Sequence, residues 1–115
     1  MIAVGRRMDR LFKEQIDYLE EPHFLVLYWG ATAEDRSVRY NITNCFDDLK
    51  FQNITRTKQT ATAILDSLEK LRFIDIRDEG NRKNIYITNY GAKALETLVL
   101  REAFSPRKSI FLEVH

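Results

Sequence analysis

The stretch TRTKQTATAILDSLEKLRFIDIRDEGNRKNIYIT, residues Thr55 to Thr88, is organised as a helix that leads directly into a charged β-hairpin. Apolar residues recur in its first half at steps of three and four, which is the spacing of one helical stripe. They are Ala61, Ile64, Leu65, Leu68 and Leu71. Thr55 and Thr57 can each cap this helix, and Thr57 fits better because Ala61 then lies one turn inside it.

The second half of the stretch predicts two short strands. Isoleucines alternate with other residues on both sides of RDEGNRKN, so each strand has one face for a core. They are Ile74, Ile76, Ile85 and Ile87. Gly80 supplies the positive φ that a tight turn requires. Arg82 and Lys83 follow this turn, and Asp78 and Glu79 precede it.

The outer face of the helix is slim, polar and partly cationic, which suits a DNA major groove about 12 Å wide. Gln59 could read an adenine edge, and Arg56 and Lys58 could reach guanine or phosphate. Cations at the hairpin tip would meet the phosphate backbone. The predicted DNA-binding residues are Arg56, Thr57, Lys58, Gln59, Thr60, Thr62, Arg82 and Lys83. An ordinary surface helix with a solvated turn is the other interpretation, and the acids at the tip favour it.

Four consecutive segments together resemble the winged helix-turn-helix transcription regulators of the MarR, HxlR and PadR kind. FDDL resembles the start of the positioning helix, ITRTKQTATAILDSLEKL the recognition helix, FIDIRDEGNRKNIYIT the wing, and TNYGAKALETL the helix after the wing. The similarity covers Phe46 to about Leu98.

The resemblance implies an α+β, mainly helical fold, with a two- to three-stranded β-wing and flanking N- and C-terminal helices. It also implies DNA binding and transcription regulation. Family members usually have glycine where Arg72 lies. A left-handed arginine costs on the order of 1 kcal/mol more than glycine, so the recognition helix is expected to end by a different turn.

Length and composition indicate one soluble domain, residues 1–115, divided into an N-terminal helix (1–21), a winged core (22–88) and a C-terminal dimerisation helix with a tail (89–115). The sequence has no membrane-spanning stretch and no signal-peptide pattern, so a cytoplasmic location is expected. The net charge of +1 does not indicate a general nucleic-acid polyanion binder, so any DNA affinity must come from local charge placement. The single cysteine, Cys45, is interpreted as a buried filler beside Phe46, with thiol redox sensing as the alternative.

The N-terminal half predicts two helices and a strand. Gly5 to Glu20 has helical spacing in Met8, Leu11, Phe12, Ile16 and Leu19, with Arg6, Arg7, Arg10 and Lys13 as solvated charges or partner contacts. His23 to Ala33 is nearly all apolar and is read as a buried helix, with a buried strand as the competing assignment. Val38, Tyr40 and Ile42 alternate with polar residues, which predicts a strand that pairs with the hairpin.

The next helix is expected to be capped by Thr43 or Asn44, with Asp47 and Asp48 near its positive end. Phe51 and Ile54 are expected to pack the turn that leads into the reading helix.

After the hairpin, Thr88 is expected to cap a helix from Asn89 to about Ala103 that Pro106 ends. Its inward stripe is predicted to be Ala92, Leu95, Leu98, Val99 and Ala103, with Leu100 and Phe104 beside it. This stripe is wider than one small domain needs, which predicts a homodimer. The tail SIFLEVH is read as a short strand or an arm on a partner.

No catalytic or cofactor-binding pattern stands out. The glycines are scattered, and adjacent Asp47 and Asp48 would point about 100° apart on a helix. His23 has no second histidine nearby, so no metal site is expected.

The sequence therefore predicts a dimeric, sequence-specific regulator that binds double-stranded DNA. The alternative is a winged-helix module that coats DNA or binds protein. The sequence does not identify a small-molecule effector.

Overall fold

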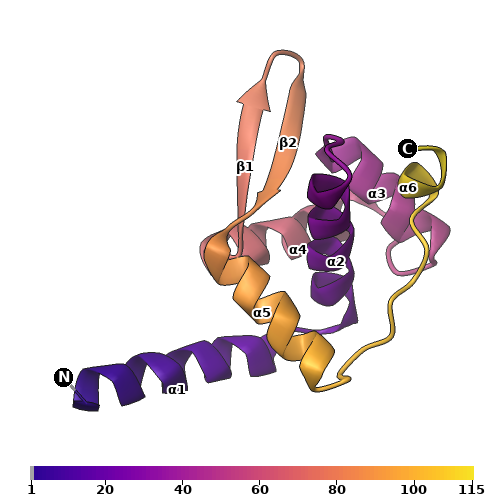
Figure 1. Ribbon diagram of the computed structural model, residues 1–115. Helices are drawn as coiled ribbons and strands as arrows, with labels where there is room; N and C mark the ends of the chain where they lie inside the picture. The colour runs from indigo at the N-terminus through magenta and orange to yellow at the C-terminus, as the bar shows by residue number, and fades with distance from the viewer. Residues whose placement is uncertain (1) are drawn as a thin grey trace.

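The computed structural model describes the backbone of residues 2–115 and the side chains of residues 10–115. Within this range it is mainly helical with one antiparallel hairpin, which confirms the predicted α+β class. The elements are α1 (Ile2–Tyr18), α2 (Glu21–Asp35), α3 (Ile42–Phe51), α4 (Lys58–Lys70), β1 (Ile74–Glu79), β2 (Arg82–Ile87), α5 (Asn89–Leu100) and α6 (Ile110–Val114). In Figure 1, α2 lies near the centre, the hairpin stands away from the body, and α1 runs outward below it.

The C-terminal half of α1 is fastened to α5. The Phe12 and Tyr90 rings pack with centroids 4.9 Å apart, and the Tyr90 hydroxyl donates a hydrogen bond to Gln15 Oε1 at 2.5 Å. Arg101 forms an ion pair with Asp17 at 2.8 Å. These contacts hold only one side of α1, and the rest of the helix extends past the body (Figure 1).

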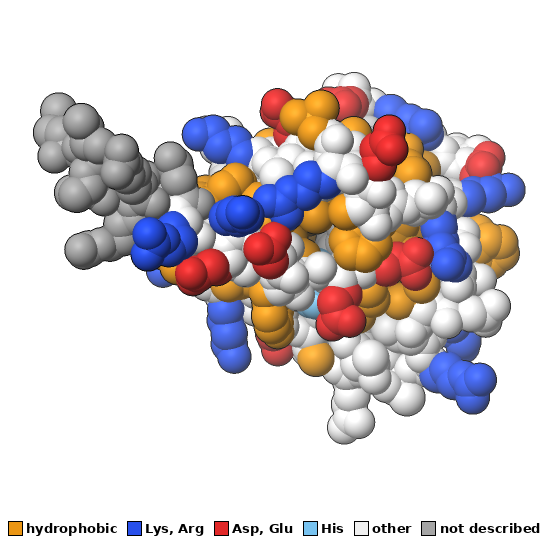
Figure 2. Space-filling view, turned by 90° about the horizontal axis from the view of Figure 1, so that it is seen from below, with side chains coloured by type: hydrophobic (Ala, Val, Ile, Leu, Met, Phe, Trp, Pro, Cys, Tyr) orange, Lys and Arg blue, Asp and Glu red, His pale blue; other side chains and the backbone are white. Residues whose placement is uncertain are grey.

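The helix expected over Gly5–Glu20 is confirmed, and Ile16 and Leu19 are buried as predicted. Leu11, which shares the predicted helical spacing, is 53% exposed. The side chains of Arg6, Arg7 and Met8 lie outside the described residues. Seen from below, this side of the molecule shows hydrophobic side chains interspersed with charges of both signs (Figure 2).

The apolar run after Pro22 forms the central helix α2, not a strand. Its side chains are buried around most of its circumference, and it packs on α5, β2 and α4. The backbone at Gly30 comes so close to the wing that an added Cβ would lie 2.7 Å from Ile87 Cδ1. The start of α2 is closed by a capping box in which the Glu20 amide donates to His23 Nδ1 at 3.0 Å.

The connection from α2 to α3 forms much less sheet than expected. One bridge pairs Asn41 with Asn84, and the Ile85 amide donates to the Tyr40 carbonyl at 2.8 Å. The prediction of Thr43 or Asn44 as the helix cap is wrong. Asn41 is the cap: its side chain accepts the Asn44 amide at 2.8 Å, and Asn44 Oδ1 accepts the Asn41 amide at 3.3 Å. Ile42 therefore enters the first turn of α3 instead of extending a strand.

Helix α4 begins as predicted at Thr57, whose hydroxyl accepts the Thr60 amide at 3.2 Å. It ends in a Schellman motif: the Arg72 amide donates to the Glu69 carbonyl and the Phe73 amide to the Leu68 carbonyl, both at 3.0 Å. Arg72 itself has φ 67°. The expectation of a different turn is therefore wrong, and arginine occupies the left-handed position where glycine would be favoured.

The same ending recurs after α2, α3 and α5, where Ser37, Asn53 and Glu102 adopt positive φ angles. At Glu102 it ends α5 at Leu100, well before Pro106, so the prediction that proline stops this helix is wrong. A polar residue with a left-handed backbone thus terminates each of these helices.

The wing is a two-stranded antiparallel hairpin in which Ile74 pairs with Ile87 and Glu79 with Arg82. Gly80 and Asn81 form the two-residue turn, and Gly80 has φ 71°, as predicted. A positive φ at the first of two turn residues is the pattern of a type II′ turn, which matches strand twist. The four isoleucines share one sheet face, in agreement with the predicted alternation.

The inward stripe of α5 differs from the prediction. Gly91, Ala94 and Leu98 are buried, whereas Ala92 and Ala103 are exposed and Val99 is 50% exposed. The cause is Gly91, where an added Cβ would lie 1.9 Å from the Phe73 carbonyl oxygen. This close contact fixes the rotation of α5, whose start is capped by Thr88 as predicted.

The C-terminal segment folds onto its own chain as helix α6, so the predicted strand or partner arm is wrong. Ser109 caps α6 and donates a hydrogen bond to Asp48 Oδ2 at 2.5 Å, while the Phe111 amide donates to Asp48 Oδ1 at 3.3 Å. Trp29 Nε1 donates to the Arg107 carbonyl at 2.8 Å. Asp48 is therefore a fully buried anchor for the tail instead of a charge near the start of α3.

Candidate nucleic-acid interface

The helix pair α3–α4 presents one polar face, and α4 is held from behind by apolar packing. Ala61, Leu65 and Leu68 are at most 2% exposed, and Ile64 is 8% exposed. The predicted DNA-binding residues on and before α4 are all exposed: Arg56, Thr57, Lys58, Gln59, Thr60 and Thr62. All six side chains are therefore accessible at the surface.

The hydroxyls on this surface differ in how they are engaged. Thr57 and Thr60 Oγ1 lie 3.0 Å apart within the helix cap, so their hydroxyls already have a partner. Within the described side chains, Lys58, Gln59 and Thr62 make no recorded hydrogen bond or ion pair. These three side chains can therefore contact a ligand without breaking a hydrogen bond or ion pair.

A cleft of about 140 Å³ lies between α3 and the start of α4. Its lining includes Lys50 and Thr55, which the sequence reasoning missed, together with Arg56 and Lys58. Thr55 is only 5% exposed, and Lys50 occupies the last turn of α3. The sequence does hold a signal for Lys50. It is a lysine in the last turn of α3, immediately before the connection to α4.

The turn between the two helices departs from the prediction at Phe51, which is 52% exposed. Ile54 does pack against the core, as predicted. Phe51 is the last residue of α3, and the following Schellman turn at Asn53 takes the chain inward only at Ile54.

The wing places Arg82 and Lys83 exposed at its tip, with Asp78 directly across from Lys83. Glu79, the second acid predicted at the tip, has its carboxylate turned back along the sheet. Glu79 Oε1 accepts hydrogen bonds from Asn84 Nδ2 at 2.7 Å, from Arg39 Nη1 at 3.1 Å, and from the Tyr86 hydroxyl.

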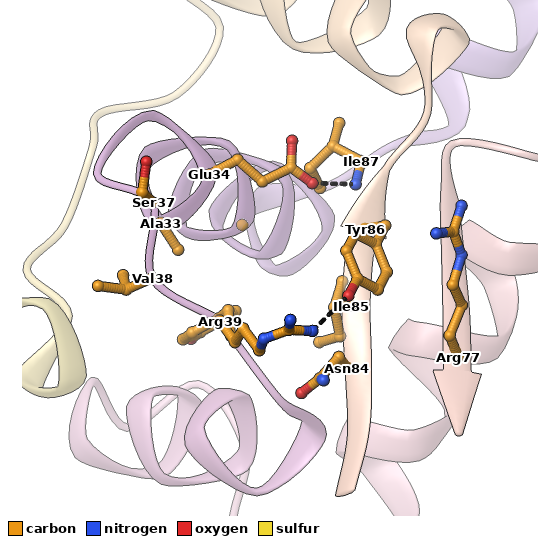
Figure 3. A pocket seen from close by; sticks show the side chains of 12 residues that line it. Ala33, Glu34, Ser37, Val38, Arg39, Arg77, Asn84, Ile85, Tyr86 and Ile87 are labelled. Atoms are coloured by element: carbon orange, nitrogen blue, oxygen red, sulfur yellow. Dashed lines mark hydrogen bonds between the residues drawn. The ribbon is translucent and has the colours of Figure 1, made fainter. Parts of the chain in front are cut away.

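Beside the wing, a half-open concavity of about 510 Å³ lies between the end of α2, the α2–α3 connection and β2. Figure 3 shows Glu34, Arg39 and Tyr86 around it. The Ile87 amide donates to Glu34 Oε1 at 2.9 Å, which ties the base of the wing to α2.

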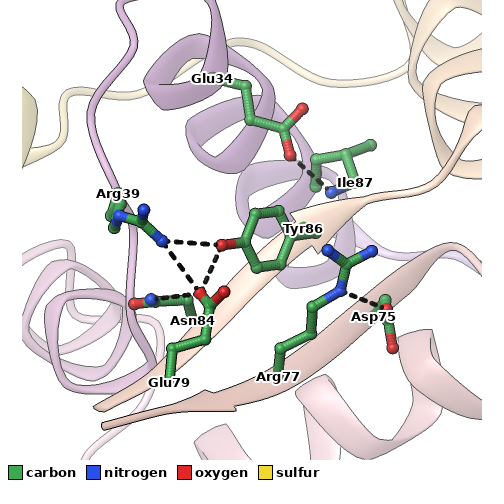
Figure 4. Close-up of polar contacts among 8 residues, drawn as sticks. All are labelled: Glu34, Arg39, Asp75, Arg77, Glu79, Asn84, Tyr86 and Ile87. Atoms are coloured by element: carbon green, nitrogen blue, oxygen red, sulfur yellow. Dashed lines mark hydrogen bonds and ion pairs between the residues drawn. The ribbon is translucent and has the colours of Figure 1, made fainter.

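Hydrogen bonds from Asn84 and Tyr86 lower the pKa of the Glu79 carboxyl because they stabilise its ionised form. The same bond to Glu79 raises the pKa of the Tyr86 hydroxyl, which therefore stays a donor. The Arg77 guanidinium lies 4.4 Å from the centre of the Tyr86 ring and pairs with Asp75 at 2.9 Å (Figure 4).

Cys45 is fully buried in the core, as predicted for a filler. Burial raises the pKa of its thiol, and the nearby Asp48 charge acts in the same direction. A thiol kept protonated is a poor nucleophile, which argues against the redox alternative.

Among the described residues, no group of three or more histidine, cysteine, aspartate or glutamate side chains is placed to hold a metal ion. None of the described helices is both long and apolar enough to cross a membrane.

No protein-family model matches the sequence, and no curated protein is significantly similar to it. Solved structures do resemble the fold. MepR, a transcription regulator of the Staphylococcus aureus multidrug efflux pump MepA, has a TM-score of 0.56 at 19% identity, over 89% of this chain and 82% of its own. The MepR F27L mutant from a multidrug-resistant S. aureus clinical isolate has a TM-score of 0.55 at 18% identity, over 90% of this chain and 82% of its own.

The heme sensor protein PefR from Streptococcus agalactiae, solved in complex with heme, has a TM-score of 0.57 at 19% identity, over 97% of this chain and 79% of its own. The chain therefore has the same mainly helical fold with a β-wing as MepR and PefR.

Proposed function

We propose that this chain is a transcription regulator that binds double-stranded DNA in a sequence-specific way, with α4 in the major groove and the wing tip on the phosphate backbone. One observation carries the proposal: the polar face of α4 is exposed along its length, while its apolar face is buried. A helix braced in this way can enter a groove without rearrangement of the core.

The side-chain chemistry supports separate roles for the exposed residues. Gln59 has the amide that pairs with an adenine edge, and Thr62 is short enough to let the helix approach the bases. Arg56 and Lys58 lie beside the α3–α4 cleft, where cations suit backbone phosphates. Arg82 and Lys83 reach the backbone from the wing tip.

A homodimer is the assembly we propose, formed through α1 and α5. Large hydrophobic side chains on these helices are strongly exposed: Leu11 53%, Tyr18 59%, Val99 50% and Leu100 76%. A two-fold dimer would set two reading helices about one DNA turn apart, on a near-palindromic site. Occupancy of such a site would block or recruit polymerase, in the cytoplasm. A light-scattering mass equal to one chain at micromolar concentration would rule the dimer out.

A second candidate is a winged-helix module that coats DNA or binds protein. The observation in its favour is the weak basic character of the chain, with a net charge of +1 and Asp78 beside the cations of the wing tip.

Selection of bound duplexes from a random pool, followed by titrations at several salt concentrations, separates the two functions. Enrichment of a sequence that binds at least about a thousandfold more tightly than random duplex supports the regulator. An affinity that depends on salt but not on sequence supports the DNA-coating module. Absence of binding to every duplex at low salt supports the protein-binding module.

A further inference from the structure

The outer part of the wing has few links to the body. Within the described residues, two ties hold the backbone of β2: the Ile87 amide donates to the Glu34 carboxylate, and the Ile85 amide donates to the Tyr40 carbonyl in the bridge between Asn41 and Asn84. Neither of them reaches beyond Asn84 towards the tip. A two-stranded ribbon without further packing is only marginally ordered, so the tip needs another support to keep one direction.

Within the described residues, the support nearest the tip is the carboxylate of Glu79, the last residue of β1. Arg39, from the α2–α3 connection, donates to Glu79 Oε1 and to the Tyr86 hydroxyl, both at 3.1 Å. Asn84, only 3% exposed, orients its amide through Glu79 alone, because its Oδ1 has no hydrogen-bond partner. Figure 4 shows these donors converging on one carboxylate oxygen.

The same contact decides the charge that the tip presents. Asp78, Glu79, Arg82 and Lys83 carry −1, −1, +1 and +1, a sum of zero. With Glu79 neutralised by Arg39, the other three sum to +1. A carboxylate left unpaired at this place would repel the phosphates that the tip cations attract.

We infer that Arg39 is a positioning residue for DNA binding: through Glu79 it fixes the direction of the wing tip and keeps this carboxylate from the phosphate backbone. The inference rests on the proposed function, and it assigns a role to a residue outside both the reading helix and the wing. The Arg39 side chain is 71% exposed, so the pair contributes little to global stability and its effect is local.

The effect of the Arg39–Glu79 contact on the wing tip is tested without DNA, by amide hydrogen exchange of the full chain. In Arg39→Gln we expect faster exchange for residues 78–83 and unchanged exchange in α2 and α4. Lys93→Gln, which changes an exposed cation on α5, is the matched control and should leave the wing unchanged. Equal protection of the tip in Arg39→Gln and in the unmodified protein would overturn the inference that Arg39 holds the wing tip in place.

The role in binding is tested by a double-mutant cycle on a selected duplex, with Arg39→Gln, Glu79→Gln and the combined variant. We expect Arg39→Gln to weaken binding about fivefold in the presence of Glu79, and less than twofold when Glu79 is already glutamine. An equal loss in both backgrounds would make Arg39 a direct phosphate contact and overturn the inference.

The hydrogen-exchange and DNA-binding measurements together distinguish failure of the inference from failure of the proposed function. If the unmodified protein binds no duplex, the proposed function fails, and the DNA-binding role of Arg39 fails with it, whatever the exchange result. If it binds a selected duplex while the cycle is additive, the inference fails and the proposed function stands.

Discussion

The Tyr40 hydroxyl donates a hydrogen bond to Asp48 Oδ2 at 2.5 Å, in a place where Tyr40 is 2% exposed and Asp48 is not exposed at all. Ser109 donates to the same oxygen. Burial, reinforced by the nearby Cys45 and Asp48, raises the pKa of the Tyr40 hydroxyl and keeps it a donor. Helix α3 is thus joined to the α2–α3 connection and to the tail through one carboxylate.

Ser109→Ala removes one donor from this buried carboxylate and also removes the cap of α6. We expect the free energy of unfolding to fall by about 1–3 kcal/mol, because the oxygen loses a partner where water cannot replace it. Urea denaturation measures the change. Ser105→Ala, at an exposed serine in the preceding connection, is the control. Equal stability of the two variants would show that the tail does not depend on Asp48.

Arg72→Gly should stabilise the protein by about 1 kcal/mol, because Arg72 has φ 67° and glycine adopts this region without a steric penalty. Arg72→Ala keeps the Cβ and therefore serves as the matched control, with little change expected. Thermal or urea unfolding of the three proteins decides the point. A gain of the same size in Arg72→Ala would trace the effect to the side chain and not to the backbone.

Gln59→Ala and Lys83→Ala should change DNA binding in different ways. Loss of the Gln59 amide should relax the preference at one base pair, at a cost of about 1–3 kcal/mol on the best sequence. Loss of Lys83 should weaken all sequences alike and reduce the salt slope by about one. Titrations on a selected and a random duplex at three salt concentrations distinguish these effects. Identical profiles for the two variants would contradict the division between groove and backbone.

Stability should decrease between pH 7.5 and 5.5 because of His23. Burial lowers the pKa of this imidazole below its ordinary 6.5, against the raising effect of Glu20, and its neutral Nδ1 accepts the Glu20 amide. Since the folded-state pKa is the lower one, the contribution is complete above the unfolded value and is lost as the pH falls through the folded value.

Urea denaturation across this pH range checks the prediction for His23. His23→Gln, which can still complete the capping box, should flatten the dependence on pH. His115→Gln removes the other histidine and should leave the dependence unchanged. A slope that survives in His23→Gln would assign it to other groups.

The parts of the fold that follow from local patterns could be predicted. Periodicity placed α4 and the hairpin, the nearly continuous apolar run placed α2, and the Thr57 cap followed from the position of Ala61. Asn41 was missed because three capping residues lie within four positions, and only the reciprocal bonds with Asn44 select one of them. The stripe of α5 was misplaced because the contact between Gly91 and the Phe73 carbonyl has no sequence pattern.

The remaining errors come from partners that are distant in the chain. Ser109 meets Asp48 across 61 positions, and this contact makes the tail a short helix on its own domain. Glu79 contacts Arg39 across 40 positions. The sequence pattern does not reveal this pairing, so Glu79 was interpreted only as an acid at the hairpin tip. The exposure of the eight predicted DNA-binding residues matches the expectation, and their contacts with DNA stay a prediction.

Among the residues that the structure describes, strand β1 pairs only with β2, so its other edge is open to pairing with another copy of the chain. A hairpin that stands clear of the body leaves an open edge to which another chain could add by backbone pairing, the first step towards fibrous aggregates. Four of the six residues of β1 are charged, namely Asp75, Arg77, Asp78 and Glu79. This charged edge discourages strand addition while the cations at the turn remain accessible.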